Sequence, residues 1–503
     1  MASTTTNIFA NLMAQAWSSI LGLIFIPVYL NYVGVESYGL IGVFMSLFTF
    51  LSLLDFGISP TMNREMARLS VSVENAQEMS DMKRTLQVLN AITALIILII
   101  LCIASPLMAR YWVQPKGISV QTVTQSFFII SFIAAIQFFS SFNAGGLLGL
   151  QKQVLLNTIY IICGTLRSVG AWLVLAFYSP TIQAFLGWQL IVMILQAFLT
   201  SYVLNKSIFH FPPGGRFRKD LVNKVWRFAV GMTATGVLAL ILTQTDKIIL
   251  SKMLNLEEFG YYSLAISIGS LIIGMITSSV TNVIYPKYSR LVAIGDSKQL
   301  TEFYHRSCQL MTFIILPVVL IIAFYSYPIL LIWTGKPDIA DNAYLLLTLT
   351  AVGTGLNGLN SLPYHLQLAH SWTRLGFYLL LASIFTLVPL MIVGVYYFGA
   401  VGGIIGWVIY NGLYGLIMVL LMHRRILKGE QWHWFMTDTF KPAIVCIAFN
   451  AVVYYFISGS LFSYSRFLQV AILCIIGLST ALICVWVLPS VKNIFTRKFL
   501  FNE

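Results

Sequence analysis

Long apolar segments separated by short polar ones form the dominant pattern of this 503-residue chain. A helix needs about 20 apolar residues to cross roughly 30 Å of membrane hydrocarbon. Fourteen segments reach that length, and we predict a membrane helix over each of them: 8–30, 38–60, 85–108, 123–149, 154–178, 181–205, 224–245, 258–286, 307–327, 343–369, 374–397, 400–422, 441–459 and 467–489. The pattern therefore predicts an all-α polytopic membrane protein.

Positive charge is concentrated in one of the two alternating sets of loops. With the N-terminus placed inside, twenty-three of the 30 Lys and Arg residues lie in inner loops or tails, six lie in outer loops, and Arg167 lies within a predicted helix. Because Lys and Arg accumulate on the cytoplasmic side of membrane proteins, both termini are predicted to be cytoplasmic. The expected location is the bacterial cytoplasmic (inner) membrane.

The composition agrees with a membrane protein and explains the charge. The chain is 58% hydrophobic and 9% charged, and its mean hydropathy is +0.85. A net charge of +13 is then mainly a topology signal, and no inter-helix segment is long enough to form a soluble nucleic-acid-binding domain.

A weak internal repeat suggests how the helices are grouped. The stretch that begins at Leu30 aligns with the stretch that begins at Leu250, and Tyr38-Gly39 then matches Phe259-Gly260. Since the seventh span starts on the same side as the first, the halves would be parallel six-helix repeats. We therefore predict a six-helix lobe over 1–205, a basic cytoplasmic linker over 206–223, a second six-helix lobe over 224–422, and two further helices with a cytoplasmic tail over 423–503.

Polar residues recur at helical spacing on several predicted spans. Asn11 and Gln15 lie one turn apart in the first span, and Asn357 belongs to a similar face in the tenth. Small and hydroxyl residues often join membrane helices, but an unpaired amide in hydrocarbon costs several kcal/mol. Helix packing and a water-lined cavity are both open for the later spans, while the first span favours a cavity.

Arg167 is the most informative single residue. It lies near the middle of its predicted span, where a charge costs at least ~2.5–3.5 kcal/mol on insertion scales. Cys163, Gly164, Gly170 and Ala171 would leave space around it, and its guanidinium suits a phosphate or a carboxylate. A structural ion pair or a clamp by backbone carbonyls within the lobe is the alternative to a binding role.

Catalytic and metal chemistry find little support in the sequence. The six Cys form no CxxC pair, the His residues show no ligand spacing, and no GxxxxGK[ST] loop is present. We expect no catalytic residue, no metal and no cofactor. Asp55 and Asp246 are the acids nearest to spans, and either is a candidate for coupling to a proton or sodium gradient.

Short motifs give the chain a resemblance to a known group. It resembles the polysaccharide-biosynthesis branch of the multidrug/oligosaccharidyl-lipid/polysaccharide exporter superfamily, and within that branch the Wzx-type O-antigen flippases. The motifs that carry the resemblance are Ile26-Pro27-Val28-Tyr29, Gly34, Tyr38-Gly39, Asp55-Phe56-Gly57, Gln244-x-Asp246 and Glu258-x-Gly260-x-Tyr262.

The resemblance implies that two lobes rock about a central cavity and move an undecaprenyl-diphosphate-linked oligosaccharide from the cytoplasmic to the periplasmic leaflet. Arg167 would bind the diphosphate, and Asn11, Gln15 and Asn357 would bind sugar. The implied partners are this lipid-linked substrate and membrane lipid; association with a glycan polymerase and a chain-length regulator is left open, and no nucleic acid is expected.

Two other functions compete with this interpretation. A cation-coupled multidrug or small-molecule antiporter of the same superfamily would usually stop at twelve spans and carry a deep acidic residue. A membrane glycan polymerase or ligase would need a long outer loop for its catalytic groups, and the chain has no such loop.

Overall fold

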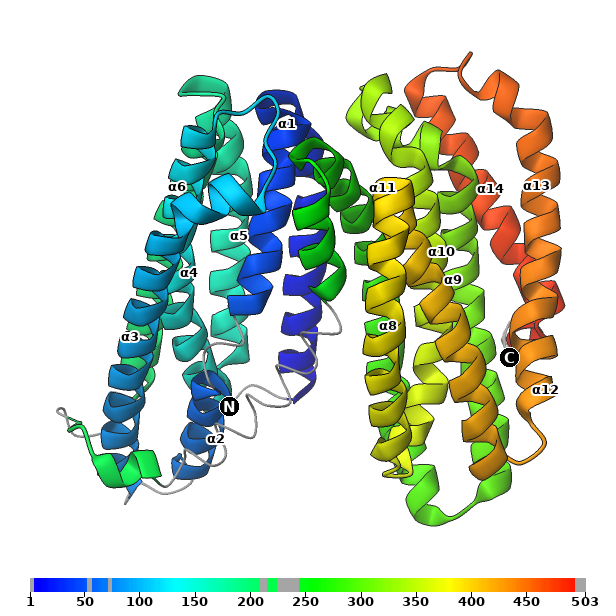
Figure 1. Ribbon diagram of the computed structural model, residues 1–503. Helices are drawn as coiled ribbons and strands as arrows, with labels where there is room; N and C mark the ends of the chain where they lie inside the picture. The colour runs from blue at the N-terminus through cyan, green and yellow to red at the C-terminus, as the bar shows by residue number, and fades with distance from the viewer. Residues whose placement is uncertain (1–3, 52–56, 71–74, 209–214, 224–243, 494–503) are drawn as a thin grey trace. The chain divides into compact units, whose positions relative to one another are not determined.

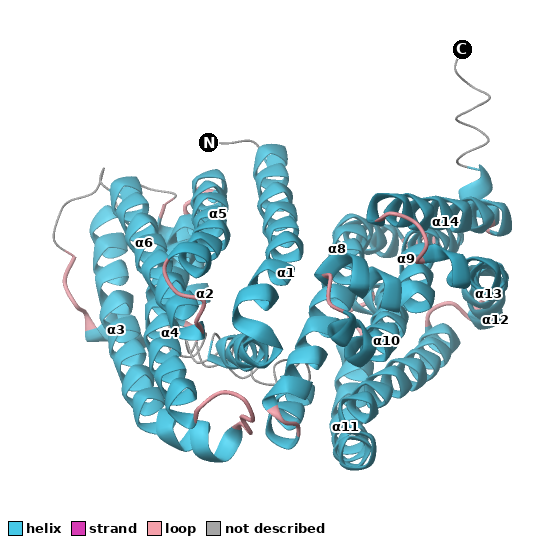
Figure 2. Ribbon diagram, turned by 90° about the horizontal axis from the view of Figure 1, so that it is seen from above, coloured by secondary structure: helices cyan, strands magenta, loops and turns pink. Residues whose placement is uncertain are grey.

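The computed structural model describes residues 4–51, 57–70, 75–208, 215–223 and 244–493. Within these ranges the secondary structure is helical and contains no strand (Figure 2). The chain divides into two compact units, Met1–Gly260 and Tyr261–Glu503. The predicted linker over 206–223 therefore falls inside the first unit, and the lobe boundaries drawn from the sequence stay predictions.

Unit 1 is a helix bundle whose members lie side by side in Figure 1. Its main pairs are α4 with α6, α1 with α5, α3 with α4, α2 with α4 and α5 with α6. The bounds are α1 Thr4–Leu51, α2 Ile58–Leu69, α3 Ala76–Leu107 with a π-helical end at Met108–Trp112, α4 Val120–Gly149, α5 Gln153–Phe177 and α6 Ile182–Ile208.

Unit 2 is also a helix bundle, in which α9 and α10 form the most extensive pair and α13 and α14 pack on α9. Helix α8 begins at the end of unit 1. The bounds are α8 Leu256–Ile294, α9 Ser297–Thr334, α10 Pro337–Ala369, α11 Thr373–Arg425, α12 Gln431–His433, the π-helix η3 Trp434–Phe440, α13 Lys441–Leu461 and α14 Arg466–Val487.

The helices start and stop where the sequence provides caps. Ser119 accepts a hydrogen bond from the Thr122 backbone nitrogen at the start of α4, and Asp296 does the same for Gln299 at the start of α9. Gly335 ends α9 in the left-handed region at φ 71°, and Pro337 then opens α10.

Among the described residues, 11 helices are long and apolar enough to span a membrane. Helix α1 covers the predicted span 8–30 and the first part of 38–60, and α11 covers 374–397 and 400–422; the non-helical residues Gly34 and Gly399 separate the two spans of each pair. The predicted span 224–245 lies almost wholly outside the described residues. The membrane-protein class is confirmed, and the count of fourteen spans stays a prediction.

Helix α11 is a helical hairpin rather than one straight rod. A Cβ added at Gly394 would lie 2.7 Å from the carbonyl oxygen of Gly402, although eight residues of continuous helix would separate the two by about 12 Å. The backbone must therefore reverse between them, and Gly399, at φ 57°, supplies the turn. The predicted spans 374–397 and 400–422 are thus two antiparallel helices.

Loops that the charge pattern places on one side are found together. In unit 1 the predicted outer residue Glu36 accepts hydrogen bonds from the backbone nitrogens of Lys116 and Gly117 at 2.6 and 2.8 Å. In unit 2 the predicted inner residue Arg425 stacks over the Trp372 ring at 4.4 Å. These contacts agree with the predicted order of sides; which side is cytoplasmic stays a prediction.

Candidate functional site

Arg167 lies near the middle of the 25-residue helix α5 and is joined to two neighbouring helices. Its Nη2 donates to Gln196 Oε1 on α6 at 3.0 Å, and Gln196 Nε2 in turn donates to Ser140 Oγ on α4 at 3.0 Å. Gln196 and Ser140 are buried. A chain of hydrogen bonds therefore fixes the guanidinium from one side.

No carboxylate among the described residues neutralises the charge of Arg167. Its hydrogen-bond partner Gln196 is a neutral amide, and the groups nearby that can act on it electrostatically are Cys163, Tyr29 and Tyr160. Among the described residues no carboxylate forms an ion pair with it. Within the described residues, the structural ion pair that the sequence left open for Arg167 is therefore not formed. The guanidinium keeps its positive charge near the middle of α5.

Aromatic side chains hold the backbone around Arg167. Trp17 on α1 donates to Thr165 Oγ1 at 2.8 Å, Tyr29 on α1 donates to the Ser168 carbonyl at 3.1 Å, and Trp188 on α6 donates to the Leu166 carbonyl at 3.1 Å. Positions 165, 166 and 168, which flank Arg167 on both sides, are therefore anchored to neighbouring helices.

The expected free space around Arg167 exists on one side only. A Cβ at Gly164 would meet nothing within 4 Å, whereas a Cβ at Gly170 would lie 2.5 Å from Trp188 Nε1. Gly170 is thus small so that the indole can pack, and the prediction that it leaves room for the guanidinium is wrong. Cys163 and Ala171 are both fully buried.

An open apolar groove runs along the same part of the bundle. It has a volume of about 820 Å³, and residues of α5 together with Trp188 line it, including Thr165, Leu166 and Gly170. The groove presents almost only hydrocarbon, which suits an acyl or prenyl chain better than a sugar.

Of the two amides of α1 expected to bind sugar, Asn11 takes part in helix packing with the described residues and Gln15 does not. Asn11 on α1 is exposed and accepts a hydrogen bond from Asn157 Nδ2 on α5 at 2.5 Å. Gln15 is also exposed and forms no hydrogen bond with the described residues. Of this pair, Gln15 keeps its full capacity for a ligand.

Asn357 belongs to an amide ladder in unit 2. Its Nδ2 donates to Asn411 Oδ1 at 2.9 Å, Asn360 Nδ2 donates to the Asn411 carbonyl at 2.9 Å, and Asn411 Nδ2 donates to the Trp407 carbonyl at 2.9 Å. The ladder joins α10 to the second arm of α11. Asn357 is exposed, so its side-chain oxygen is left for a ligand.

The two acids that the sequence offers for ion coupling, Asp55 and Asp246, differ in whether the structure describes them. Asp55 lies outside the described residues. Asp246 is half-buried in a short helical segment, and its neighbour Lys247 donates to Gln244 Oε1 at 3.1 Å. Their role in ion coupling stays a proposal.

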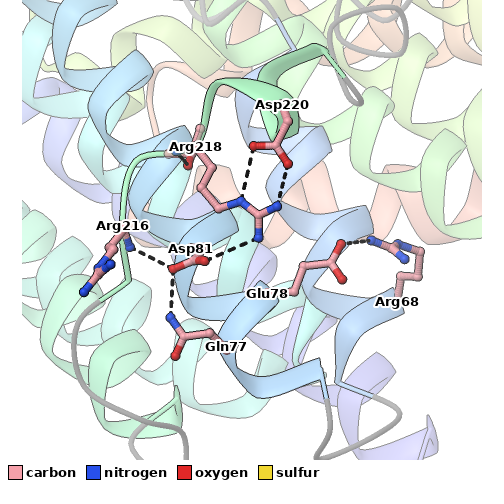
Figure 3. Close-up of polar contacts among 8 residues, drawn as sticks. Arg68, Gln77, Glu78, Asp81, Arg216, Arg218 and Asp220 are labelled. Carbon is pink, nitrogen blue, oxygen red and sulfur yellow. Dashed lines mark hydrogen bonds and ion pairs between the residues drawn. The ribbon is translucent and has the colours of Figure 1, made fainter.

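A second polar cluster lies at the predicted inner end of unit 1 (Figure 3). The buried Asp81 on α3 accepts hydrogen bonds from the Arg216 backbone nitrogen at 2.8 Å and from Gln77 Nε2 at 2.9 Å, and Arg218 Nη1 lies 3.7 Å away. Arg218 also forms a bidentate pair with Asp220, and these hydrogen bonds hold the pKa of the exposed Asp220 carboxyl below its ordinary value. The basic segment after α6 is thus bound to α3.

Sequence reasoning missed a cluster in unit 2. His305 on α9, His433 in α12 and Asp438 in η3 lie with ligand atoms within 4.8 Å of one another. More than 125 residues separate His305 from the other two, so spacing could not reveal the cluster. The closeness of Glu430, His433 and Asp438 in the sequence was an available signal for that half of the cluster.

Comparison with known proteins agrees with the fold and the motifs. The sequence profile of the family described as polysaccharide biosynthesis protein matches residues 32–337, more than half of the chain. A Shigella flexneri protein assigned provisionally as an O-antigen transporter is 21% identical over 399 residues, which cover 78% of this chain and 91% of that protein.

Two solved structures share the fold. The lipid II flippase MurJ in an inward closed conformation has a TM-score of 0.72 and 17% identity, covering 98% of this chain and 100% of its own. An inward-facing multidrug resistance transporter of the MATE family, in the MOP superfamily, has a TM-score of 0.63 and 16% identity, covering 82% of this chain and 94% of its own.

Proposed function

Because the chain belongs to the polysaccharide biosynthesis protein family, we propose that it is a flippase for undecaprenyl-diphosphate-linked O-antigen repeat units. It carries them from the cytoplasmic to the periplasmic leaflet by alternating access. The transport is not covalent chemistry, so no catalytic residue is assigned.

The uncompensated charge of Arg167 is the observation that supports this proposal best. A diphosphate that leaves water must be neutralised, and Arg167 offers a cation held near the middle of α5 with no carboxylate beside it among the described residues. Gln196 uses one nitrogen of the guanidinium, so the remaining donors are available to phosphate oxygens.

Other candidate groups, some in unit 1 and one in unit 2, suit the other parts of the substrate. The apolar groove along α5 gives the prenyl chain a place next to the diphosphate. Gln15, the oxygen of Asn357 and, after release from Asn157, Asn11 supply hydrogen bonds to sugar hydroxyls. Asp55 and Asp246 are the proposed positions for coupling to a proton or sodium gradient.

The MATE transporter with a similar fold keeps a cation-coupled antiporter as the second candidate. A drug antiporter would be expected to bind cations, and an unneutralised arginine inside the bundle repels them. The family match and the O-antigen relative also favour the flippase.

Deletion of the gene tests the proposal. We expect loss of long-chain surface glycan, with lipid-linked repeat units accumulating on the cytoplasmic leaflet, and rescue by the intact gene. Unchanged surface glycan together with altered resistance to cationic drugs would instead support the antiporter.

A further inference from the structure

Two imidazoles and two carboxylates gather at one end of unit 2, where α9 meets the segment that leads into α13. They are His305 on α9, Glu430 before α12, His433 in α12 and Asp438 in η3. Both loops are predicted to lie on the inner side. None of these groups has a part in the transport site described above.

Asp438 is held rigidly at the centre of this cluster. It is fully buried, its Oδ1 accepts a hydrogen bond from Gln309 Nε2 at 2.8 Å, and its backbone oxygen accepts one from Thr312 at 2.8 Å. Gln309 is itself fixed by the Ser490 backbone nitrogen at 2.8 Å. The carboxylate therefore has a defined position from which to orient a partner.

That partner is His305, whose two ring nitrogens both face carboxylates. Nδ1 lies 2.5 Å from Asp438 Oδ2, and Nε2 lies 3.3 Å from Glu430 Oε2. A neutral imidazole carries one N–H, and the short contact to Asp438 uses it. Nε2 then presents a lone pair to an anionic oxygen, which is repulsive unless a cation lies between them.

The geometry at Nε2 suits a shared metal ion better than a hydrogen bond. His305 Nε2 is buried and makes no hydrogen bond, so the Glu430 oxygen at 3.3 Å is poorly aligned for one. Two ligand atoms that each lie about 2.0–2.1 Å from a tetrahedral zinc ion are about 3.3 Å apart and off each other's bond axis. The observed separation matches that value.

His433 lies close enough to His305 to offer a further ligand atom. Its ring lies 4.3 Å from that of His305 between centroids, its Nε2 is 3.9 Å from Asp438 Oδ1, and its side chain is 48% exposed. An exposed ring can turn toward a bound ion without disturbing the core.

We propose that His305, Glu430 and His433 bind one Zn²⁺ ion, with Asp438 orienting His305 through Nδ1. Imidazole and carboxylate donors are a typical zinc set, and the carboxylate behind the ligating histidine fixes its tautomer and ring orientation. The ion ties α9 to the start of α13 and so holds the last two helices on the unit. This replaces the sequence-based expectation of no metal.

Equilibrium binding of Zn²⁺ to the full-length protein, purified in detergent through a tag without histidine, tests the proposal. We expect one zinc per chain and a higher thermal midpoint with zinc. His433→Ala and Glu430→Gln each weaken zinc binding at least tenfold and remove the thermal shift. His370→Ala removes a histidine from another predicted inner loop and leaves both readouts unchanged.

The competing arrangement is a doubly protonated His305 that bridges Asp438 and Glu430 without metal. Absence of stoichiometric zinc in the wild type would overturn the proposal, and so would equal zinc affinity in the His433→Ala and Glu430→Gln variants. Because zinc content is measured without substrate, its outcome is separate from that of the flippase test.

Discussion

Replacement of Arg167 by Met separates a binding role from a structural one. The change removes a charge near the middle of α5, which relieves a cost of about 2.5–3.5 kcal/mol on insertion scales. It also removes the charged hydrogen bond to Gln196, worth about 1.5–3 kcal/mol. The two terms nearly cancel, so we expect the stability of the variant to change by less than about 2 kcal/mol.

Binding of the substrate is expected to change much more. Loss of one charge-assisted contact to a diphosphate costs about 1.5–3 kcal/mol, which corresponds to about a 10- to 150-fold rise in Kd. Arg167→Lys keeps the charge but loses the planar fork, so its Kd should fall between those of the wild type and the Met variant.

The assay is binding of undecaprenyl diphosphate to the purified variants in detergent, with thermal unfolding measured on the same samples. Arg110→Met is the control, since Arg110 is an exposed arginine of unit 1 at the end of α3. The reasoning would be refuted by a Met variant that unfolds far more easily than the wild type while its folded fraction binds diphosphate normally.

Three further substitutions test the packing and the polar contacts by thermal unfolding. Gly170→Ala should destabilise the protein by about 1–3 kcal/mol because the new methyl group overlaps the Trp188 indole. Gly164→Ala on the same helix is the control: its methyl group would meet nothing within 4 Å, so the stability should stay the same or rise by about 0.5–1 kcal/mol. Equal effects of the two substitutions would contradict the packing of Trp188 on Gly170. Gly402→Ala should also destabilise, because its Cβ would overlap the backbone of the facing arm of α11; a neutral result would argue against the hairpin. Asp81→Asn should lower the stability by about 1–3 kcal/mol because it weakens the buried hydrogen bonds of this side chain. Asp220→Asn, at an exposed position, should change the stability little. A larger effect at Asp220 than at Asp81 would show that Asp81 does not hold the basic segment.

Much of the fold follows from the sequence because membrane hydrocarbon imposes a single length rule. Most predicted spans coincide with helices to within a few residues, for example 123–149 with Val120–Gly149 and 154–178 with Gln153–Phe177. Long helices such as Ser297–Thr334 extend well past the predicted 307–327, since hydropathy detects the apolar part of a helix and not its polar ends.

The site was only partly predictable because hydropathy does not fix helix rotation. The depth of Arg167 follows from its place in the sequence, yet its partner Gln196 and the indole beside Gly170 depend on how α5 and α6 face each other. In α8, hydroxyls bond back to their own helix, as Thr277 does to the Ile273 carbonyl at 2.8 Å. Contacts between distant segments carry no periodic signal.

Transfer of a lipid-linked oligosaccharide between leaflets of a reconstituted vesicle tests the central claim most directly. In vesicles that contain an undecaprenyl-diphosphate-linked oligosaccharide, the wild-type protein should move these molecules from the inner to the outer leaflet, where an added glycosidase cleaves them. The rate of cleavage should fall to the protein-free level with the Arg167→Ala variant and to an intermediate level with the Arg167→Lys variant. Glycosidase access equal to that of protein-free vesicles, from protein that is folded and inserted, would contradict the account.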